Sequence, residues 1–265
     1  MTTFRTFASG STGNAALLSC GDTHLLIDMG VSCRRVCQAL AGLGLGPGDL
    51  TAVLITHEHT DHTAGLATYI KKNHTPILTT PGTARQLACR LAGIEPLLRT
   101  AGLGSTVELG CVEAALLPTS HDCAESAAFR FATPDGTVGY LTDTGYIPRE
   151  TGEALLGADL LVLESNHDPD MVLAGPYPYT LKRRVLGESG HLSNADAARY
   201  AAASVRAGTG HILLAHLSRE NNFPQLALET VGGALREEGL TACLDAAPWD
   251  RESGVYTLEG AACRG

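Results

Sequence analysis

The chain has 265 residues, of which 44% are hydrophobic and 18% are charged, and this composition fits a folded globular protein. Its net charge of −9 disfavours binding to polyanions through the whole surface, although a local basic patch would be sufficient. No uninterrupted apolar run reaches about eighteen residues, which excludes a membrane-spanning helix. The first residues lack a basic segment followed by an apolar run, so we expect no signal peptide and a cytoplasmic location.

Strand-like and helix-like segments alternate along the chain, and no low-complexity linker separates them. We therefore expect a single domain over residues 1–265 of the α/β class, and two inner sheets with helices outside are one way to build it. The predicted strands are 4–8, 15–20, 24–28, 53–55, 76–79, 107–109, 112–117, 127–133, 138–142, 160–163, 212–215, 243–246 and 255–258. The predicted helices are 32–41, 65–72, 81–92, 193–207 and 224–238.

The most informative stretch follows the apolar run 53–55 and contains His57, His59, Asp61 and His62. A buried strand that ends in a polar loop holds that loop in place, and sites in α/β proteins lie at such strand ends. Imidazole and carboxylate together are ligands for zinc, manganese or iron, and not for magnesium or calcium alone. The stretch therefore predicts a transition-metal site, and a solvated histidine-rich loop is the alternative.

Four later segments repeat this pattern, in which a residue able to bind metal or move a proton follows an apolar strand. A single histidine after a strand is weak evidence for a site. Several such residues are stronger evidence, because the ligands of a buried metal converge from several strand ends. The residues concerned are His121, Asp143, Glu164, His167 and His216.

The segment Thr56-His57-Glu58-His59-Thr60-Asp61-His62 resembles the metal-binding signature of the metallo-β-lactamase superfamily. The resemblance covers nearly the whole chain and implies a four-layer αββα sandwich with two divalent metal ions, zinc or manganese, at one edge of the sheets. It implies that the first metal is bound by His57, His59 and His121. It implies that the second is bound by Asp61, His62 and His216, with Asp143 as the bridging carboxylate.

Five further stretches are similar to the YycJ/WalJ nuclease group within this superfamily. The resemblance implies a nuclease, specifically a 5′-to-3′ DNA exonuclease linked to mismatch-repair proteins, and therefore a nucleic-acid partner. The stretches are Gly10–Asn14, Ser165–Asp168, Gly175–Arg184, Gly190–Asn194 and Ala215–Asn222.

The catalytic groups that this chemistry needs are assigned to Asp61, His191 and Glu164. His191 is our candidate for the proton donor to the leaving 3′ oxygen, with Glu164 assisting it. The pair is similar to the glutamate and histidine of ribonuclease Z, while a structural loop histidine is the alternative. His167 either faces the substrate or hydrogen-bonds a metal ligand, and the sequence leaves both possibilities open.

Two other segments are candidates for contact with the substrate. Ser11 and Asn14 lie in a glycine-rich turn that is able to donate hydrogen bonds to a phosphate, or that is a plain turn. Lys182, Arg183 and Arg184 form a basic run that would contact phosphates, close to Tyr177 and Tyr179, which would stack on bases. A solvated surface is the alternative for the basic run.

Other functions remain compatible with the same ligand set. A ribonuclease is possible because metal ligands do not distinguish ribose from deoxyribose. A thioester or lactone hydrolase of the same fold and a non-catalytic metal-binding scaffold are the remaining alternatives. The sequence does not predict an oligomeric state.

Overall fold

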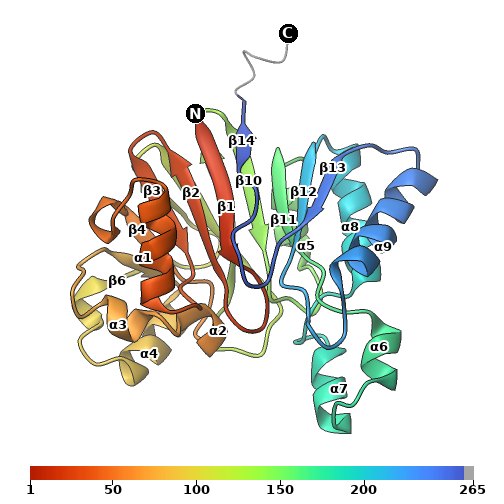
Figure 1. The fold of residues 1–265 in the computed structure, drawn as a ribbon, viewed down its shortest axis with the longest axis horizontal. Helices are drawn as coiled ribbons and strands as arrows, with labels where there is room; N and C mark the ends of the chain where they lie inside the picture. Colours follow the sequence, from red (N-terminus) through yellow and green to blue (C-terminus); the bar gives the residue numbers. More distant parts are fainter. Residues whose placement is uncertain (260–265) are drawn as a thin grey trace.

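A computed structural model describes residues 1–259 and contains two seven-stranded β-sheets packed face to face (Figure 1). The first sheet has the strand order β14-β1-β2-β3-β4-β5-β6. β3 and the next three strands run parallel, so their carboxyl ends meet at one edge. Its strands are β1 (Thr2–Ala8), β2 (Ala15–Cys20), β3 (Thr23–Ile27), β4 (Ala52–Leu54), β5 (Ile77–Thr79), β6 (Leu98–Thr100) and β14 (Tyr256–Leu258).

The second sheet has the order β13-β12-β11-β10-β9-β8-β7, and β10 to β13 are parallel. All five residues of β11 are buried, which is the pattern of a strand covered on both faces. Its strands are β7 (Thr106–Leu109), β8 (Val112–Pro118), β9 (Ala127–Thr133), β10 (Gly136–Leu141), β11 (Leu160–Glu164), β12 (His211–Ala215) and β13 (Cys243–Ala246).

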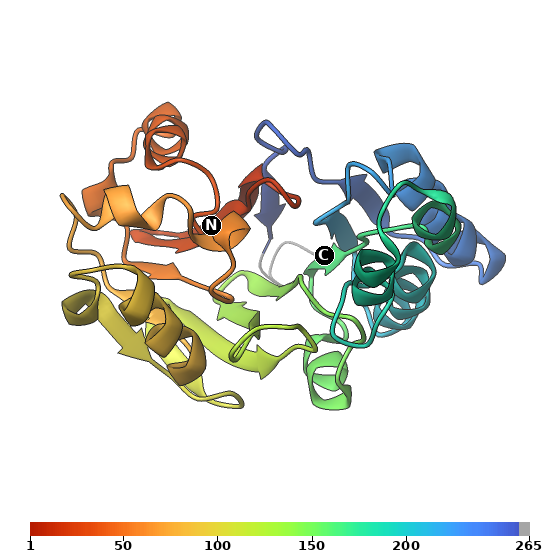
Figure 2. The ribbon, with the colours of Figure 1, turned by 90° about the horizontal axis from the view of Figure 1, so that it is seen from below.

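Helices cover the outer face of each sheet, so the architecture is the predicted αββα sandwich (Figure 2). The first sheet packs against α1 (Cys33–Gly42), α3 (Leu66–Tyr69) and α4 (Pro81–Arg90), and the second packs against α5 (Arg149–Leu155), α8 (Asn194–Arg206) and α9 (Pro224–Glu237). Between the sheets lies a third apolar layer, which includes Phe4, Leu18, Phe129 and Val162. No helix within residues 1–259 is long and apolar enough to cross a membrane.

Several short elements differ from the sequence prediction. The helix expected over 65–72 is shortened to α3, and a separate turn that was not predicted, α2 (Thr60–Thr63), precedes it and contains the metal-motif residues Asp61 and His62. β6, α5, α6 (Pro169–Ala174) and α7 (Tyr179–Val185) were not predicted. Each spans seven residues or fewer, which is too short for a hydrophobic repeat to be recognised.

Three loops of the first sheet interlock at its carboxyl edge through backbone hydrogen bonds. Asn14 N donates to the carbonyl of Asp61 at 2.8 Å, and Gly30 N donates to the carbonyl of Asn14 at 2.7 Å. A Cβ on Gly30 would lie 1.6 Å from the Asp61 carbonyl oxygen, so only glycine fits between these loops. The interlock fixes the backbone that carries Asp61 and His62.

We predict that Gly30→Ala lowers the free energy of unfolding by about 3 kcal/mol, at the upper end of the cost of overpacking. Gly42→Ala is the matched control, because no atom lies within 4 Å of a Cβ at Gly42, the last residue of α1. The control should change the free energy by no more than about 1 kcal/mol. Urea unfolding measures both, and equal effects of the two substitutions would contradict the interlock.

Candidate metal centre

The candidate ligands come from both sheets and meet at the edge where the parallel strands end, which is the lower edge in Figure 1 and faces the viewer in Figure 2. The loop after β4 and the short helix α2 carry the motif histidines and Asp61. The second sheet contributes His121 after β8, Asp143 after β10 and His216 after β12. The residues predicted as ligands are therefore brought together around one point.

Three imidazole nitrogens form the first ligand group. His57 Nε2 lies 3.0 Å from His59 Nδ1, which in turn lies 3.2 Å from His121 Nε2. Ligand nitrogens that bind one tetrahedral zinc ion at about 2.0–2.1 Å are separated by roughly 3.3 Å. The spacing of the three nitrogens therefore suits a shared cation.

Asp61, His62 and His216 form the second group. Asp61 Oδ2 lies 3.6 Å from His62 Nε2 and 3.5 Å from His216 Nε2. Asp143 lies between the two groups, because its Oδ2 is 3.3 Å from His62 Nε2 and its Oδ1 is 3.8 Å from His121 Nε2. This position is the one a bridging carboxylate would need.

Two buried atoms support a cation at this point. Asp143 Oδ2 and His216 Nε2 are buried and have no hydrogen-bond partner. Leaving a buried polar atom unpaired costs about 1–3 kcal/mol, so such atoms are rare without a reason. A bound divalent ion would satisfy both, and the residues present therefore fit the divalent metal that the family resemblance implies.

In four of the candidate ligand histidines, Nδ1 donates a hydrogen bond to an acceptor outside the group of metal ligands. The Nε2 atom of each ring is therefore left to face the centre of the site. His62 Nδ1 donates to Asp28 at 2.7 Å, and His216 Nδ1 donates to Glu164 at 2.8 Å. His121 Nδ1 donates to the Gly190 carbonyl at 3.0 Å, and His57 Nδ1 donates to the Thr56 hydroxyl at 3.1 Å. The outer acceptors thus set both the ring orientation and the tautomer.

The electrostatics of the cluster combine strong burial with close opposite charges. Burial lowers the pKa of His57 well below its usual value, which favours the neutral form that binds metal. Burial also lowers the pKa of His216, but Asp143, Asp61 and Glu164 outweigh it and raise the value to about 10. The carboxylates therefore stabilise a positive charge beside His216, whether a proton or a metal ion carries it.

Glu164 is completely buried and accepts four hydrogen bonds. Its Oε1 accepts from His191 Nδ1 at 2.9 Å and from His216 Nδ1, while Oε2 accepts from the backbone N–H groups of Thr144 and Leu192 at 2.9 and 3.1 Å. Burial alone would raise the pKa of Glu164, but the charge and hydrogen bond of His191 and the bond from His216 hold it at about 2. Glu164 is therefore ionised and fully paired, which makes it an orienting group.

His191 is held by Glu164 and remains partly accessible, since its side chain is 20% exposed. Its ring centroid lies 5.1 Å from that of His121 and 5.2 Å from that of His216. With Nδ1 occupied by Glu164, Nε2 is the nitrogen available to a substrate beside the metal cluster. The predicted pair of Glu164 and His191 is therefore assembled.

Backbone strain is concentrated at the centre. Within residues 1–259, the non-glycine residues with positive φ are Asp28 at 60°, Asp143 at 57° and His216 at 54°. Each follows the end of a parallel strand by one or two residues. A conformation of this kind costs about 1–3 kcal/mol and persists only where the surroundings impose it. Here it turns the chain sharply after the strand and directs the side chain into the cluster.

Asp28 and Thr56 are site residues that the sequence reasoning missed. Asp28 is fully buried and accepts from Thr56 N at 2.9 Å and from Thr56 Oγ1 at 3.0 Å in addition to His62. A signal for Asp28 was present in the sequence, because Asp28 follows the apolar run 25–27 just as the other site residues follow their own apolar runs.

Glu58 of the metal-binding motif has a structural role. Its carboxylate accepts a hydrogen bond from Ala124 N and so holds the loop that carries His121.

Ser11 and Arg184 are brought to the site, where they line a pocket of about 110 Å³ together with His191. Arg184 makes an ion pair with Asp122 there. Arg183 does not line this pocket, and Lys182 donates to the Leu173 carbonyl, joining α7 to α6.

Asn14 does not match its predicted role in substrate binding. It is completely buried, its Oδ1 accepts from Gly10 N, and its Nδ2 lies 3.0 Å from His62 Nε2. The side chain therefore holds the glycine-rich turn against the metal loop. Sequence could not show this, because the turn's tertiary contacts decide which way the amide points.

His167 is buried, and burial lowers its pKa to about 4. Its backbone carbonyl accepts from Asn194 N, but its side chain forms no hydrogen bond to a candidate metal ligand within residues 1–259. Of the two predicted roles, contact with a metal ligand is therefore not observed. Contact with the substrate remains a prediction.

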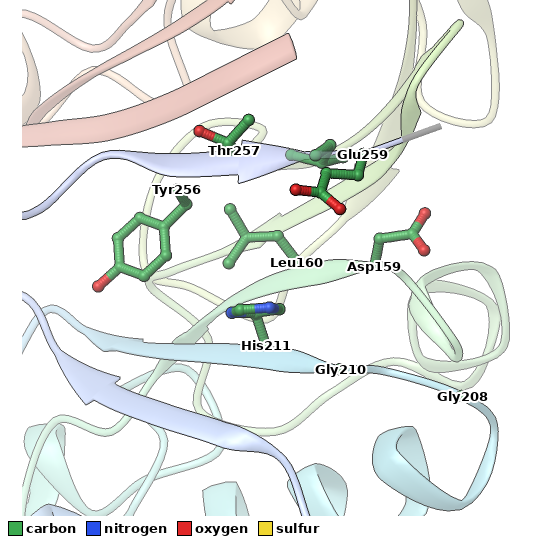
Figure 3. A pocket seen from close by; sticks show the side chains of 9 residues that line it. Asp159, Leu160, Gly208, Gly210, His211, Tyr256, Thr257 and Glu259 are labelled. Carbon is green, nitrogen blue, oxygen red and sulfur yellow. The ribbon is translucent and has the colours of Figure 1, made fainter. Parts of the chain in front are cut away.

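A larger hollow of about 410 Å³ lies at the opposite end of the same strands (Figure 3). It is lined by Leu160 and His211, the first residues of β11 and β12, and by Tyr256 of β14. The metal cluster follows the last residues of β10 and β12, so the hollow is separated from it by the length of a strand. We therefore assign the smaller pocket beside His191, and not this hollow, to the site.

Comparison with known proteins identifies the family. Residues 23–217 match the family described as the beta-lactamase superfamily domain. The exodeoxyribonuclease YycJ of Bacillus anthracis is 34% identical over 237 residues, which is 89% of this chain and 90% of that protein. The exodeoxyribonuclease WalJ of Streptococcus pneumoniae serotype 2 is 32% identical over 253 residues, 94% of each chain. The crystal structure of the metallo-beta-lactamase fold protein YhfI from Bacillus subtilis has a TM-score of 0.69 at 20% identity, covering 97% of this chain and 100% of that one, and shows the shared fold.

We predict that Asp28→Asn weakens binding of a divalent metal by about 10–100-fold, because the neutral amide no longer fixes His62 Nδ1–H as a carboxylate does. Asp22→Asn makes the same change of charge at an exposed position between β2 and β3 and should leave the affinity unchanged. Competition with a chromophoric chelator measures both. Equal affinity of the Asp28 variant and the wild type would contradict the orienting role.

Proposed function

Because the chain belongs to the beta-lactamase superfamily, within its YycJ-like group, and is a metallo-hydrolase, we propose that it is a nuclease that removes nucleotides from the 5′ end of DNA. The observation that carries the proposal is His191, held on Glu164 beside seven candidate metal ligands. A proton donor held beside a metal cluster is needed when the leaving group, such as an alkoxide, is a poor one. The names of the YycJ and WalJ relatives supply the choice of DNA.

The residues proposed to hold two ions, zinc or manganese, are those of the two ligand groups with Asp143 between them. When bound, such ions lower the pKa of water toward neutrality and neutralise charge on phosphate oxygens. Asp61 is proposed to be both a ligand of the second ion and a catalytic residue. Its side chain is 25% exposed while His62 and Asp143 are buried, so it lies on the side of the cluster that is open to solvent. Burial opposes ionisation of Asp61, but the nearby His216 and His62 hold its pKa below the usual value.

His191 acts as the general acid in this proposal. Cleavage of the P–O3′ bond releases an alkoxide that needs a proton, and His191 Nε2 gives that proton while Glu164 stabilises the ring through Nδ1. The attacking water oxygen forms the new P–O bond, so the shortened strand keeps a 5′-phosphate. The released nucleotide carries a 3′-hydroxyl.

The 5′-to-3′ direction and an association with mismatch-repair proteins are proposed from the resemblance to the YycJ/WalJ group. A cytoplasmic location is also proposed. Contacts of Ser11, His167 and Arg184 with the substrate are likewise proposed, with Arg184 supported by its place in the pocket beside His191. Lys182 and Arg183 are proposed to contact the strand further from the centre.

We predict that the metal-loaded protein releases mononucleotides from 5′-labelled DNA, and that Asp61→Ala and Asp143→Ala abolish this release. The two carboxylates lie among the candidate ligands of the second metal, so their loss removes the charge that holds it. A panel of single- and double-stranded DNA, RNA, a thioester and a lactone, with zinc and with manganese, provides the measurement.

The control is Asp22→Ala, at an exposed turn away from the centre, which should retain full activity. Activity on RNA or on a thioester with none on DNA would replace the proposal with the corresponding alternative. A metal-loaded protein that turns over none of these substrates but binds a repair protein would favour a scaffold.

We predict that His191→Ala lowers the single-turnover rate on DNA by about 10²–10⁴-fold, the usual contribution of a general acid. The loss should nearly disappear on a substrate whose 3′ bridging oxygen is replaced by sulfur, because a thiolate with a pKa of about 8.5 leaves without a proton. An equal loss on both substrates would show that His191 acts only in positioning.

A further inference from the structure

We propose that the pocket beside His191 receives the 5′-terminal nucleotide as the leaving group, with its base against Tyr177. This inference rests on the proposed nuclease function and extends it to the part of the substrate that is released. The pocket is lined by residues of α7, of the segments before and after it, and of the loops that follow β1, β8, β11 and β12. Figure 1 shows α6 and α7 extending beyond the sheet edge where the metal ligands meet.

Under the proposed cleavage of the P–O3′ bond, the position of His191 shows where the released nucleotide lies. When water attacks phosphorus, the P–O3′ bond breaks, and both electrons of that bond go to O3′ of the terminal nucleotide. O3′ takes its proton from His191, so the terminal nucleotide lies on the His191 side of the scissile phosphate. The pocket begins on that side, because His191 and its neighbour Gly190 are part of its wall.

The size of the pocket fits part of one terminal nucleotide. At about 110 Å³ it is well below the roughly 300–1,000 Å³ of pockets that enclose a whole drug-sized ligand. It therefore encloses part of a single nucleotide, and the rest of that nucleotide extends toward the scissile phosphate. A strand whose terminal unit occupies this pocket is cut after one nucleotide, which gives an exonuclease a structural basis.

The residues that line the pocket are better suited to bind a nucleoside than a bare phosphate. Tyr177 is half-buried in the wall and presents an aromatic ring, on which any base can stack. Asn221 lines the pocket and is 1% exposed, and its Oδ1 has no hydrogen-bond partner, so this oxygen is free to accept a hydrogen bond. The cation of the pocket, Arg184, is already neutralised by Asp122 at 2.5 Å.

The neighbouring residue Tyr179 provides a matched comparison. Tyr179 is two positions further along the chain, is 74% exposed, and is not part of the pocket wall, so the base stacking expected of it from the sequence is not assigned to it here. The two tyrosines therefore share a segment and a chemistry, and they differ in access to the proposed nucleotide. A general effect of losing an aromatic ring from this segment would appear in both.

The test compares the metal-loaded wild type, Tyr177→Ala, Tyr177→Phe and Tyr179→Ala on DNA with a normal or an abasic 5′-terminal nucleotide. On normal DNA, Tyr177→Ala should lower kcat/KM about tenfold, the size expected for the loss of one base–aromatic stack. Tyr177→Phe keeps the ring and should restore it, and Tyr179→Ala should match the wild type. On the abasic end, Tyr177→Ala should cause no further loss.

Metal content and the thermal unfolding midpoint establish that each variant is folded and loaded. The proposal is overturned if Tyr177→Ala and Tyr179→Ala have equal effects, or if the loss from Tyr177→Ala is as large on the abasic end. Equilibrium binding of deoxyadenosine 5′-monophosphate separates this failure from failure of the proposed function. If the wild type cuts no DNA, weaker nucleotide binding by Tyr177→Ala alone still supports the pocket, and equal binding by all variants overturns it.

Discussion

The rest of the centre depends on the hydrogen bonds that the buried carboxylate of Glu164 accepts. An ionised carboxylate with no exposure to water is strongly unfavourable unless it is paired and hydrogen-bonded. Four N–H donors meet that requirement, and two of them belong to rings with different tasks, His216 as a candidate ligand and His191 as the proposed acid. One charge thus orients the metal-binding nitrogen of one ring and the proton-donating nitrogen of the other. A change in either ring would be felt by its neighbour through the shared oxygen.

The same principle extends across both sheets. Asp28 holds His62 from the first sheet much as Glu164 holds His216 from the second, and both acceptors are fully buried at strand ends. The strained backbone of Asp28, Asp143 and His216 is the cost of this arrangement. Rigid parallel strands over three apolar layers offset that cost, so a stable scaffold supports a locally unfavourable but ordered centre.

Local patterns predicted the α/β class and the convergence of polar residues, because apolar runs give strands and polar residues just after them gather at one edge. The four-layer sandwich and the division of the ligands between two metals came from the resemblance to the superfamily. Sequence could not predict contacts that exist only after the sheets pack. The amide of Asn14, expected to donate to a phosphate, lies against His62, and Asp28 acquires its role from a histidine 34 positions away. The short helix α7 has no sequence repeat to reveal it, yet its placement decides that Arg184 and not Arg183 reaches the pocket.

We expect His191 to stay free of metal while five other histidines bind it, although Asp143, Glu164, His191 and His216 are also close enough to hold an ion. Nitrogen NMR of ¹⁵N-histidine protein loaded with ¹¹³Cd tests this directly through metal–nitrogen couplings. We expect couplings at Nε2 of His57, His62, His121 and His216, a coupling at Nδ1 of His59, and none at His191. A coupling at either nitrogen of His191 would contradict the account, because a metal ligand could not serve as the proton donor.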